Sequence, residues 1–247
     1  MNKERLDRLV VERGLADSRE QAQRLIRAGS VLVNGHPSHK AGVRVACDVL
    51  LAVKEPPRFV SRGGEKLEGA FGAFAFRVKG LRGIDVGAST GGFTDCLLQH
   101  GAEHVIAADV GRGQLHMSLR NDPRVTVLER FNVRHVREGD LPFRPDFAVF
   151  DVSFISLELV LPPVVVLLEG SGEIVTLIKP QFEAGRGQVG RGGVVRDPDV
   201  RQAVLERIRL FGENKLSLQW LGCVESPLTG PAGNVEYLAW WRKPEET

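Results

Sequence analysis

RGIDVGASTGGFTDCLLQHGAEHVIAADV, residues 82–110, has the pattern of a strand, a glycine-rich turn, a helix and a second strand. Gly87 opens the turn, Gly91 and Gly92 close it, and Asp109 ends the second strand. A turn of this kind, after a parallel strand, lets a ligand approach the backbone, and an acid ending the next strand can hold two ribose hydroxyls. The stretch therefore predicts a site for an adenosine-containing cofactor.

The turn differs from two common nucleotide-binding motifs. It is not GxGxxG, and the chain contains no GxxxxGK[ST], which excludes a P-loop. Asp85 stands two residues before Gly87, and the resulting DxGxxxGG pattern resembles the S-adenosylmethionine site of Rossmann-like methyltransferases. NAD binding and a tight turn without a ligand are the alternatives at this point. Three glycines with two flanking acids are more than a tight turn needs.

The composition is that of an ordinary soluble protein with one large or two unequal domains. The chain has 247 residues, of which 43% are hydrophobic and 26% charged. Residues 1–10 lack the apolar core of a signal peptide, and the apolar run at 159–168 is too short to span a membrane. Three widely spaced cysteines indicate reduced thiols and a cytoplasmic protein. No Cys/His group has metal-ligand spacing, so we expect no metal, and we expect a monomer.

The amino-terminal part is basic. Residues 1–59 carry eleven basic and seven acidic side chains, while the rest of the chain is slightly acidic. Residues 2–13 have helical spacing, Ser18 with Gln21 predicts the start of a second helix, and Asn34-Gly35 predicts a hairpin turn. If the helices pack antiparallel, basic side chains could share a face and contact phosphates, although a solvated surface is the alternative. These side chains are Arg5, Arg8, Arg19, Arg24, Arg27 and Lys40.

The proline-containing segment 55–58 predicts a boundary between domains at 1–57 and 58–247. A helix is then expected from about Glu65, with Lys66 in its first turn. A cation gains nothing from the helix dipole at that end. Lys66 is therefore either a surface residue or a functional one.

Strands and helices alternate over the remaining chain, which predicts an α/β protein with a doubly wound parallel sheet. Helical stretches are expected on either side of Pro162-Pro163, and the glycine-rich segment 185–196 reads as a mobile lid or RNA clamp. Ligands of such sheets bind beyond the carboxyl ends of the strands. Four polar residues fall at such ends: Asp85, Asp109, Asp151 and Lys179.

The whole chain resembles one family. The phrases SREQAQRLIRAGSVLVNG and AGVRV, within residues 3–55, resemble the S4 RNA-binding domain. Together with DVGASTGGFTDCLL, ADVGRGQL, LRNDPRV, DVSFISL, KPQFE and GNVEY, they identify the chain as a member of the TlyA family of hemolysin A-like ribosomal RNA methyltransferases. The resemblance implies a Rossmann-like methyltransferase with a mostly parallel seven-stranded sheet, preceded by a small α+β S4-like domain.

The catalytic part is similar to FtsJ-type 2′-O-methyltransferases, which carry a Lys-Asp-Lys-Glu tetrad. Its positions here are Lys66, Asp151, Lys179 and Glu236. A free lysine has a pKa of about 10.4, so Lys179 either acts as a base with its charge suppressed or stays charged and positions the hydroxyl. The expected cofactor contacts are Asp85, Gly87, Ser89, Gly91, Gly92, Phe93, Asp109 and Asn132. Arg62 and Arg186 join the expected RNA contacts.

The family implies an S-adenosylmethionine-dependent enzyme that methylates the ribose 2′-hydroxyl of cytidine in large-subunit and, in some members, small-subunit ribosomal RNA. Ribosomal RNA and ribosomal subunits are then the expected partners. Three rival interpretations remain: a non-enzymatic ribosome-assembly factor, an NAD enzyme, and a membrane-lytic protein of the kind that the older family name suggests. No amphipathic or membrane-spanning segment supports the last of these.

Overall fold

The structure is a computed structural model that describes residues 2–54 and 57–245. The chain forms two compact units, Met1–Arg58 and Phe59–Thr247. The predicted proline-containing boundary lies partly outside the described residues, because Glu55 and Pro56 are not among them.

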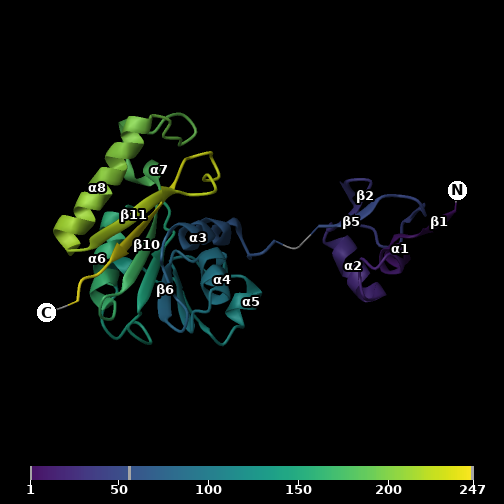
Figure 1. Cartoon of the computed structure of the whole chain (residues 1–247), viewed down its shortest axis with the longest axis horizontal. Helices are drawn as coiled ribbons and strands as arrows, with labels where there is room; N and C mark the ends of the chain where they lie inside the picture. Colours follow the sequence, from purple (N-terminus) through teal and green to yellow (C-terminus); the bar gives the residue numbers. More distant parts are fainter. Residues whose placement is uncertain (1, 55–56, 246–247) are drawn as a thin grey trace. The chain divides into compact units, whose positions relative to one another are not determined.

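The amino-terminal unit packs two helices against two small sheets (Figure 1). Its core is formed by apolar residues of both helices, among them Leu6, Val10 and Ile26. Strand β1 pairs with β4, and β2 lies between β3 and β5. In chain order the elements are β1 (Lys3–Arg5), α1 (Leu6–Glu12), α2 (Arg19–Arg27), β2 (Val31–Val33), β3 (His36–Pro37), β4 (Arg44–Ala46) and β5 (Leu51–Val53).

Local signals in this unit are confirmed with two changes of detail. Ser18 caps α2 and its Oγ accepts the Gln21 N–H, but the Gln21 side chain accepts from the Asp17 N–H, one residue earlier than in a capping box. Asn34 and Gly35 both have positive φ, as a hairpin turn requires. The first helix begins at Leu6 and not at residue 2, because Lys3–Arg5 pairs with Arg44–Ala46 as a strand.

A buried carboxylate joins the parts of this unit. Asp7 is fully buried, and its oxygens accept hydrogen bonds from Arg5, Arg19 and Gln23 at 2.8–3.0 Å. The hydrogen bond from the Arg5 guanidinium is the main cause that holds the pKa of Asp7 well below its usual range. Two of the predicted RNA contacts, Arg5 and Arg19, therefore stabilise the fold.

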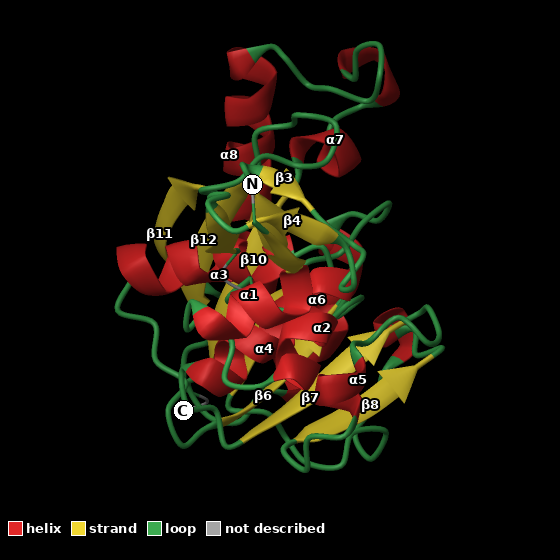
Figure 2. Ribbon diagram, turned by 90° about the vertical axis from the view of Figure 1, so that its right-hand side faces the viewer, coloured by secondary structure: helices red, strands yellow, loops and turns green. Residues whose placement is uncertain are grey.

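The carboxy-terminal unit is built on one seven-stranded sheet in the order β11-β12-β10-β9-β6-β7-β8. Pairs β6–β7, β7–β8, β6–β9 and β9–β10 are parallel, and β12 is antiparallel to both of its neighbours, β10 and β11. Figure 2 shows β11 and β12 towards one end of the sheet and β7 and β8 at the other. The predicted fold class is confirmed. The strands are β6 (Arg82–Val86), β7 (His104–Asp109), β8 (Val125–Glu129), β9 (Phe147–Phe150), β10 (Glu173–Ile178), β11 (Gln219–Glu225) and β12 (Tyr237–Arg242).

Each face of the sheet carries its own apolar core. One core joins the sheet to α3 (Arg62–Ala73), α4 (Gly92–Gln99) and α5 (Met117–Arg120). The other joins it to α6 (Leu157–Leu167) and α8 (Pro198–Leu216), as Figure 1 shows. The sheet is thus covered on both faces, which leaves its edges and strand ends for a ligand.

Two helix predictions were wrong. Pro162 and Pro163 lie inside one helix, α6, and do not divide it. Ser156 caps its start, and burial of residues such as Leu161 and Val164 outweighs the backbone hydrogen bonds that the prolines remove. The helix α3 begins at Arg62 and not near Glu65, because the Ser61 side chain accepts the Gly63 N–H.

Three short helices complete the unit: η1 (Val133–His135), α7 (Pro180–Glu183) and η2 (Arg186–Gln188). Among the described residues, none of the helices combines the length and apolarity needed to cross a bilayer.

Replacement of Asp7 by Asn should loosen the amino-terminal unit. The neutral amide at residue 7 cannot balance the positive charges of Arg5 and Arg19. We therefore expect the free energy of opening, measured by hydrogen exchange over residues 6–27, to fall by about 2 kcal/mol at pH 7. Because the pKa of Asp7 is lowered in the folded state, its contribution is full above about pH 4 and is lost as the pH falls further. Hydrogen-exchange mass spectrometry of the full chain measures this. Asp17→Asn, at an exposed carboxylate of the same unit, is the control, and equal protection in the two variants would contradict the assignment.

Candidate active site

Two neighbouring pockets lie at the carboxyl ends of the parallel strands. The larger, of about 490 Å³, is the Lys66 pocket, and the smaller, of about 310 Å³, is the Asp109 pocket. Both are lined by Gly87, Ser89 and Asp151, so they adjoin at the glycine turn. The predicted cofactor turn thus faces both spaces.

The turn has glycine where no other residue fits. Gly87 and Gly91 have φ of +88° and +98°. A Cβ on Gly87 would lie 2.7 Å from the carbonyl oxygen of Asp151, and one on Gly92 would lie 2.3 Å from Ser61 Oγ. The turn therefore brings β6 and α4 into backbone contact with the ends of β9 and α3. The result is a pocket wall made largely of backbone.

Four of the predicted cofactor contacts line the Asp109 pocket: Gly87, Ser89, Asp109 and Asn132. Asp109 Oδ2 accepts the Ser89 N–H at 2.9 Å and Oδ1 accepts the Gly111 N–H at 2.6 Å. A carboxylate has about four acceptor positions, so each oxygen can accept a further hydrogen bond. Asn132 caps η1 through the Arg134 N–H and lines the same pocket.

Asp85 and Phe93 lie deeper than the other predicted cofactor contacts. Asp85 is fully buried beneath the turn and lines neither pocket, while Thr94 Oγ1 donates to its Oδ2 at 2.6 Å. Burial raises the pKa of Asp85 to about 7. Phe93 is 2% exposed and belongs to the core beneath α4, although one edge lines the Lys66 pocket.

The four tetrad residues come together as two ion pairs. Lys66 Nζ lies 2.5 Å from Glu236 Oε2, and Lys179 Nζ lies 2.6 Å from Asp151 Oδ1. Lys66 and Asp151 line the same pocket, so both pairs border one space. Asp151 has the most exposed side chain of the four at 22%.

Two supporting residues were missed from the sequence. Ser153 Oγ accepts from Lys179 Nζ at 3.0 Å, and Gln181 Nε2 donates to Glu236 Oε1 at 2.9 Å. Each therefore holds one member of an ion pair in place. Both lie two residues after a tetrad position, in DVSF and KPQFE, and that proximity is the signal that could have identified them.

Phe154 is a third missed residue. Its side chain is 90% exposed, its backbone has the left-handed φ of +63°, and it lines the Asp109 pocket. Its ring packs against Phe182, with the centroids 4.8 Å apart. A strained backbone that holds an apolar ring in solvent beside a pocket suggests contact with a ligand.

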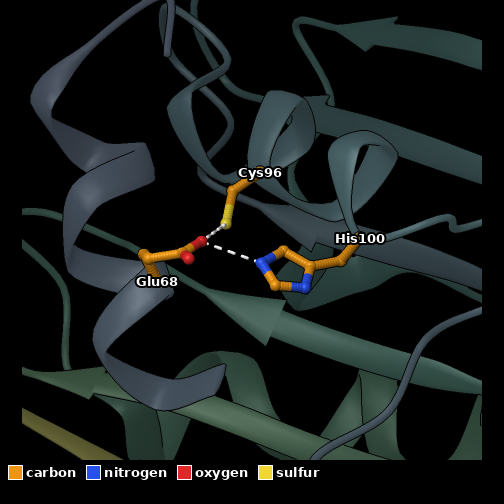
Figure 3. A group of neighbouring side chains, drawn as sticks. All are labelled: Glu68, Cys96 and His100. Carbon is orange, nitrogen blue, oxygen red and sulfur yellow. Dashed lines mark hydrogen bonds and ion pairs between the residues drawn. The ribbon is translucent and has the colours of Figure 1, made fainter. Parts of the chain in front are cut away.

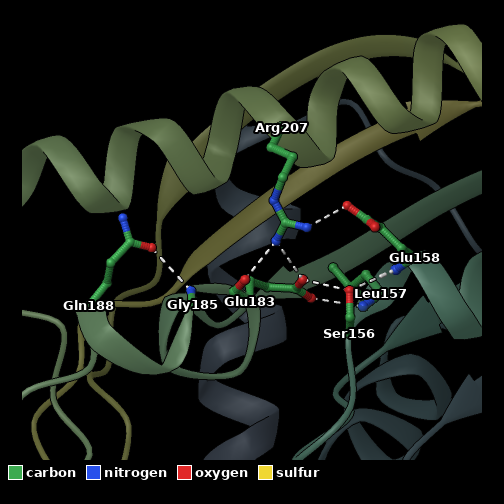
Figure 4. Close-up of polar contacts among 7 residues, drawn as sticks. All are labelled: Ser156, Leu157, Glu158, Glu183, Gly185, Gln188 and Arg207. Atoms are coloured by element: carbon green, nitrogen blue, oxygen red, sulfur yellow. Dashed lines mark hydrogen bonds and ion pairs between the residues drawn. The ribbon is translucent and has the colours of Figure 1, made fainter.

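A polar network holds the segment that follows Lys179 (Figure 4). Glu183, at the end of α7, accepts from the Leu157 N–H and from Ser156 Oγ, each at 2.7 Å. Arg207 of α8 contacts both Glu183 and Glu158, at 3.2 and 2.6 Å. Burial raises the pKa of Glu183. The network fixes α7, and with it Lys179 and Gln181, between α6 and α8.

The predicted RNA contacts fall into four groups in the structure. Arg5 and Arg19 bind Asp7, as described above. Arg62 is exposed and lines the Lys66 pocket, whereas the side chain of Arg186 lies outside what the structure describes. The remaining four are exposed: Arg8, Arg24, Arg27 and Lys40.

Comparisons with known proteins identify the families of both units. Residues 59–243 match the FtsJ-like methyltransferase family, and residues 4–46 match the S4 domain. The 16S/23S rRNA (cytidine-2′-O)-methyltransferase TlyA of Mycobacterium tuberculosis is 52% identical over 96% of this chain and 89% of its own. Hemolysin A of Brachyspira hyodysenteriae is 42% identical over 95% of this chain and 98% of its own.

A solved structure gives the same result. A putative hemolysin from Streptococcus thermophilus superposes with a TM-score of 0.75 at 44% identity, covering 99% of this chain and 90% of that one. The similarity therefore includes both units and is not limited to the methyltransferase sheet. The chain belongs to the FtsJ-like methyltransferases and, among them, to the TlyA proteins, in which an S4 domain precedes the methyltransferase unit.

Proposed function

We propose that this methyltransferase transfers a methyl group from S-adenosylmethionine to the ribose 2′-hydroxyl of a cytidine in large-subunit and also small-subunit ribosomal RNA. The observation that carries the proposal is the pair of ion-paired lysines beside a pocket walled by a glycine turn. The name of the Mycobacterium tuberculosis relative supplies the nucleoside and the two RNAs.

The residues around the two pockets fit this cofactor. Gly87 lines both pockets without a side chain, so a ligand can approach its backbone closely. Asp109 offers unused acceptor positions to a pair of ribose hydroxyls, and Asn132 adds an amide in the same pocket. Apolar residues such as Val133 and Val152 line that pocket and suit an adenine ring. The methionine portion would then extend past Gly87 towards Lys66.

S-adenosylmethionine, when bound, supplies a methyl carbon on a sulfonium that an oxygen can attack in line. The ribose hydroxyl would have to lose its proton in that step, either to an uncharged Lys179 or to water. Lys179 is our candidate for the group beside that hydroxyl, because Asp151 and Ser153 fix its Nζ. Lys66 lines the Lys66 pocket and would align the ribose, while the buried Glu236 holds the Lys66 ammonium group in place.

Phe154 is the candidate contact for the target base. An exposed ring beside the pocket can stack on a base that has been turned out of its helix. The ring is already held against Phe182, so little freedom is lost on stacking.

Delivery of the RNA would fall to the amino-terminal unit. Its exposed Arg8, Arg24, Arg27 and Lys40 can neutralise phosphates. We therefore propose ribosomal RNA or a ribosomal subunit as partner and the cytoplasm as location. The rival of a non-enzymatic assembly factor is disfavoured because both ion pairs are intact. A membrane-lytic action has no support in the helices of residues 2–54 and 57–245.

The central test is transfer of labelled methyl groups to ribosomal RNA, with mapping of 2′-O-methyl sites. Lys179→Ala should lower the single-turnover rate by at least a hundredfold and leave the affinity for S-adenosylmethionine unchanged, because the side chain acts on the hydroxyl. Lys215→Ala, at an exposed lysine of α8, is the control and should react as the wild type does. An unchanged rate for Lys179→Ala would exclude the role.

Asp109→Ala should weaken binding of S-adenosylmethionine by at least tenfold, because two charge-assisted hydrogen bonds to the ribose are lost. The variant also frees the Ser89 and Gly111 N–H groups, so Asp109→Asn, which keeps one acceptor, should bind with intermediate affinity. Isothermal titration calorimetry measures both. Equal affinity in Asp109→Ala and the wild type would remove Asp109 from the cofactor site.

Asp85 should make the cofactor-free protein less stable as the pH rises. Its pKa is raised to about 7, so the folded chain keeps a proton that the unfolded chain loses near pH 4, and stability falls between these values. Asp85→Asn should remove that fall, which is on the order of a few kcal/mol. Denaturant unfolding at pH 5 and pH 8 gives the comparison. The same pH dependence in both proteins would show that Asp85 is ionised throughout.

A further inference from the structure

Three side chains that sequence spacing did not connect gather between α3 and α4 (Figure 3). Glu68 comes from α3, Cys96 from α4, and His100, four residues after Cys96, is the residue that caps the carboxyl end of α4. Cys96 Sγ lies 3.6 Å from Glu68 Oε2, and His100 Nε2 lies 2.8 Å from the same oxygen. The three atoms all lie within 4.8 Å of one another. The group therefore offers a sulfur, a nitrogen and an oxygen to one point in space.

These atoms match the chemistry of one class of ion. Thiolate, imidazole and carboxylate are the side chains that bind zinc, at about 2.0–2.3 Å, in tetrahedral sites. Ligand atoms of such a site are about 3.3–3.8 Å apart, as those distances and tetrahedral angles require. The Cys96–Glu68 separation is already in that range, and the His100–Glu68 separation needs to widen by about half an ångström.

The packing of α3 on α4 brings the three ligands close together before any ion arrives. Residues four apart on a helix share one face, which places Cys96 and His100 side by side. The His100 ring stacks on Phe71 of α3, with centroids 3.7 Å apart and planes 6° apart. Helices α3 and α4 pack on the same core. Little ordering is therefore needed for the three to act together.

Access and charge also fit a bound ion. Cys96 is fully buried, while the side chains of Glu68 and His100 are 33% and 28% exposed. An ion can thus enter from solvent past two ligands and meet the thiol at the bottom. Coordination replaces the thiol proton, which passes to solvent, so Cys96 and Glu68 together would balance a divalent ion.

We propose that Glu68, Cys96 and His100 bind a single zinc ion, with water as the fourth ligand. The ion would join the two helices that border the glycine turn, because α4 begins at Gly92 and α3 carries Lys66. Lys66 and Glu68 lie on opposite sides of α3, so the ion acts on the helix packing and takes no part in methyl transfer. This inference does not depend on the proposed substrate.

Titration of the chelator-treated full chain with Co²⁺ tests the proposal directly. Cobalt bound by a thiolate gives an intense near-ultraviolet charge-transfer band, and tetrahedral cobalt gives strong visible bands. We expect both to saturate at one equivalent and to disappear when one equivalent of Zn²⁺ is added. Binding of Zn²⁺ should also raise the midpoint of thermal unfolding in a concentration-dependent way.

Variants identify the ligands. Cys96→Ser should abolish the charge-transfer band, and His100→Ala and Glu68→Gln should bind at least tenfold more weakly. Cys223→Ser and Cys47→Ser, at the other two thiols, are matched controls and should retain the band. Circular dichroism checks the fold of each variant. If Cys96→Ser does not fold, the affinity of His100→Ala for Co²⁺ tests the site instead. No saturable band, a band that persists in Cys96→Ser, or unchanged affinity in His100→Ala would overturn the site.

Discussion

The buried ion pair between Lys66 and Glu236 constrains the rest of the methyltransferase unit. It joins α3 to the start of β12 across 170 positions of the chain. A buried pair gains little net stability, because desolvation of the two charges offsets their attraction, yet loss of one partner leaves a buried charge and costs about 3–5 kcal/mol. Such a pair is tolerated only where both ends are held accurately, and Gln181 adds a third contact to Glu236. The pair therefore defines geometry more than it adds stability.

The one antiparallel strand makes this pair possible. In a fully parallel sheet, the residue that precedes a strand lies at the amino ends of the strands, opposite the carboxyl ends where ligands bind. Because β12 is antiparallel to β10, Tyr237 at the start of β12 pairs with Ile178 at the end of β10. Glu236, just before Tyr237, and Lys179, just after Ile178, therefore lie at the same end of the two strands. The reversal brings the amino end of a strand to the carboxyl ends of the others. It thereby supplies a carboxylate to a site that already has Asp151 and Lys179 from parallel strands.

The sequence predicts the sheet and the residue types of the site, but not how the charges pair. Glycine turns, alternation of strands and helices, and polar strand ends are local patterns. They were sufficient for the fold class and for placing Asp109, Asp151 and Lys179 at the carboxyl ends of strands. Which lysine pairs with which acid depends on the register of β12, a long-range property. Likewise, the group of Glu68, Cys96 and His100 exists only because α3 packs on α4.

The amino-terminal unit also shows that a local pattern, here the number of basic residues, does not reveal long-range contacts. Charge alone overstates its RNA-binding surface. Counting basic residues predicts six phosphate contacts there, but the fold uses Arg5 and Arg19 to balance Asp7. Four of the six predicted contacts are exposed and make no ion pair with Asp7, which on single-stranded RNA corresponds to a salt dependence with a slope of about −3 for these four. That is enough to bring an RNA near and too little to select one nucleotide. On the proposed mechanism, selection would come from the shape of the RNA and from the fit of its ribose at the Lys66 pocket, because a small displacement of a reacting group slows a reaction sharply.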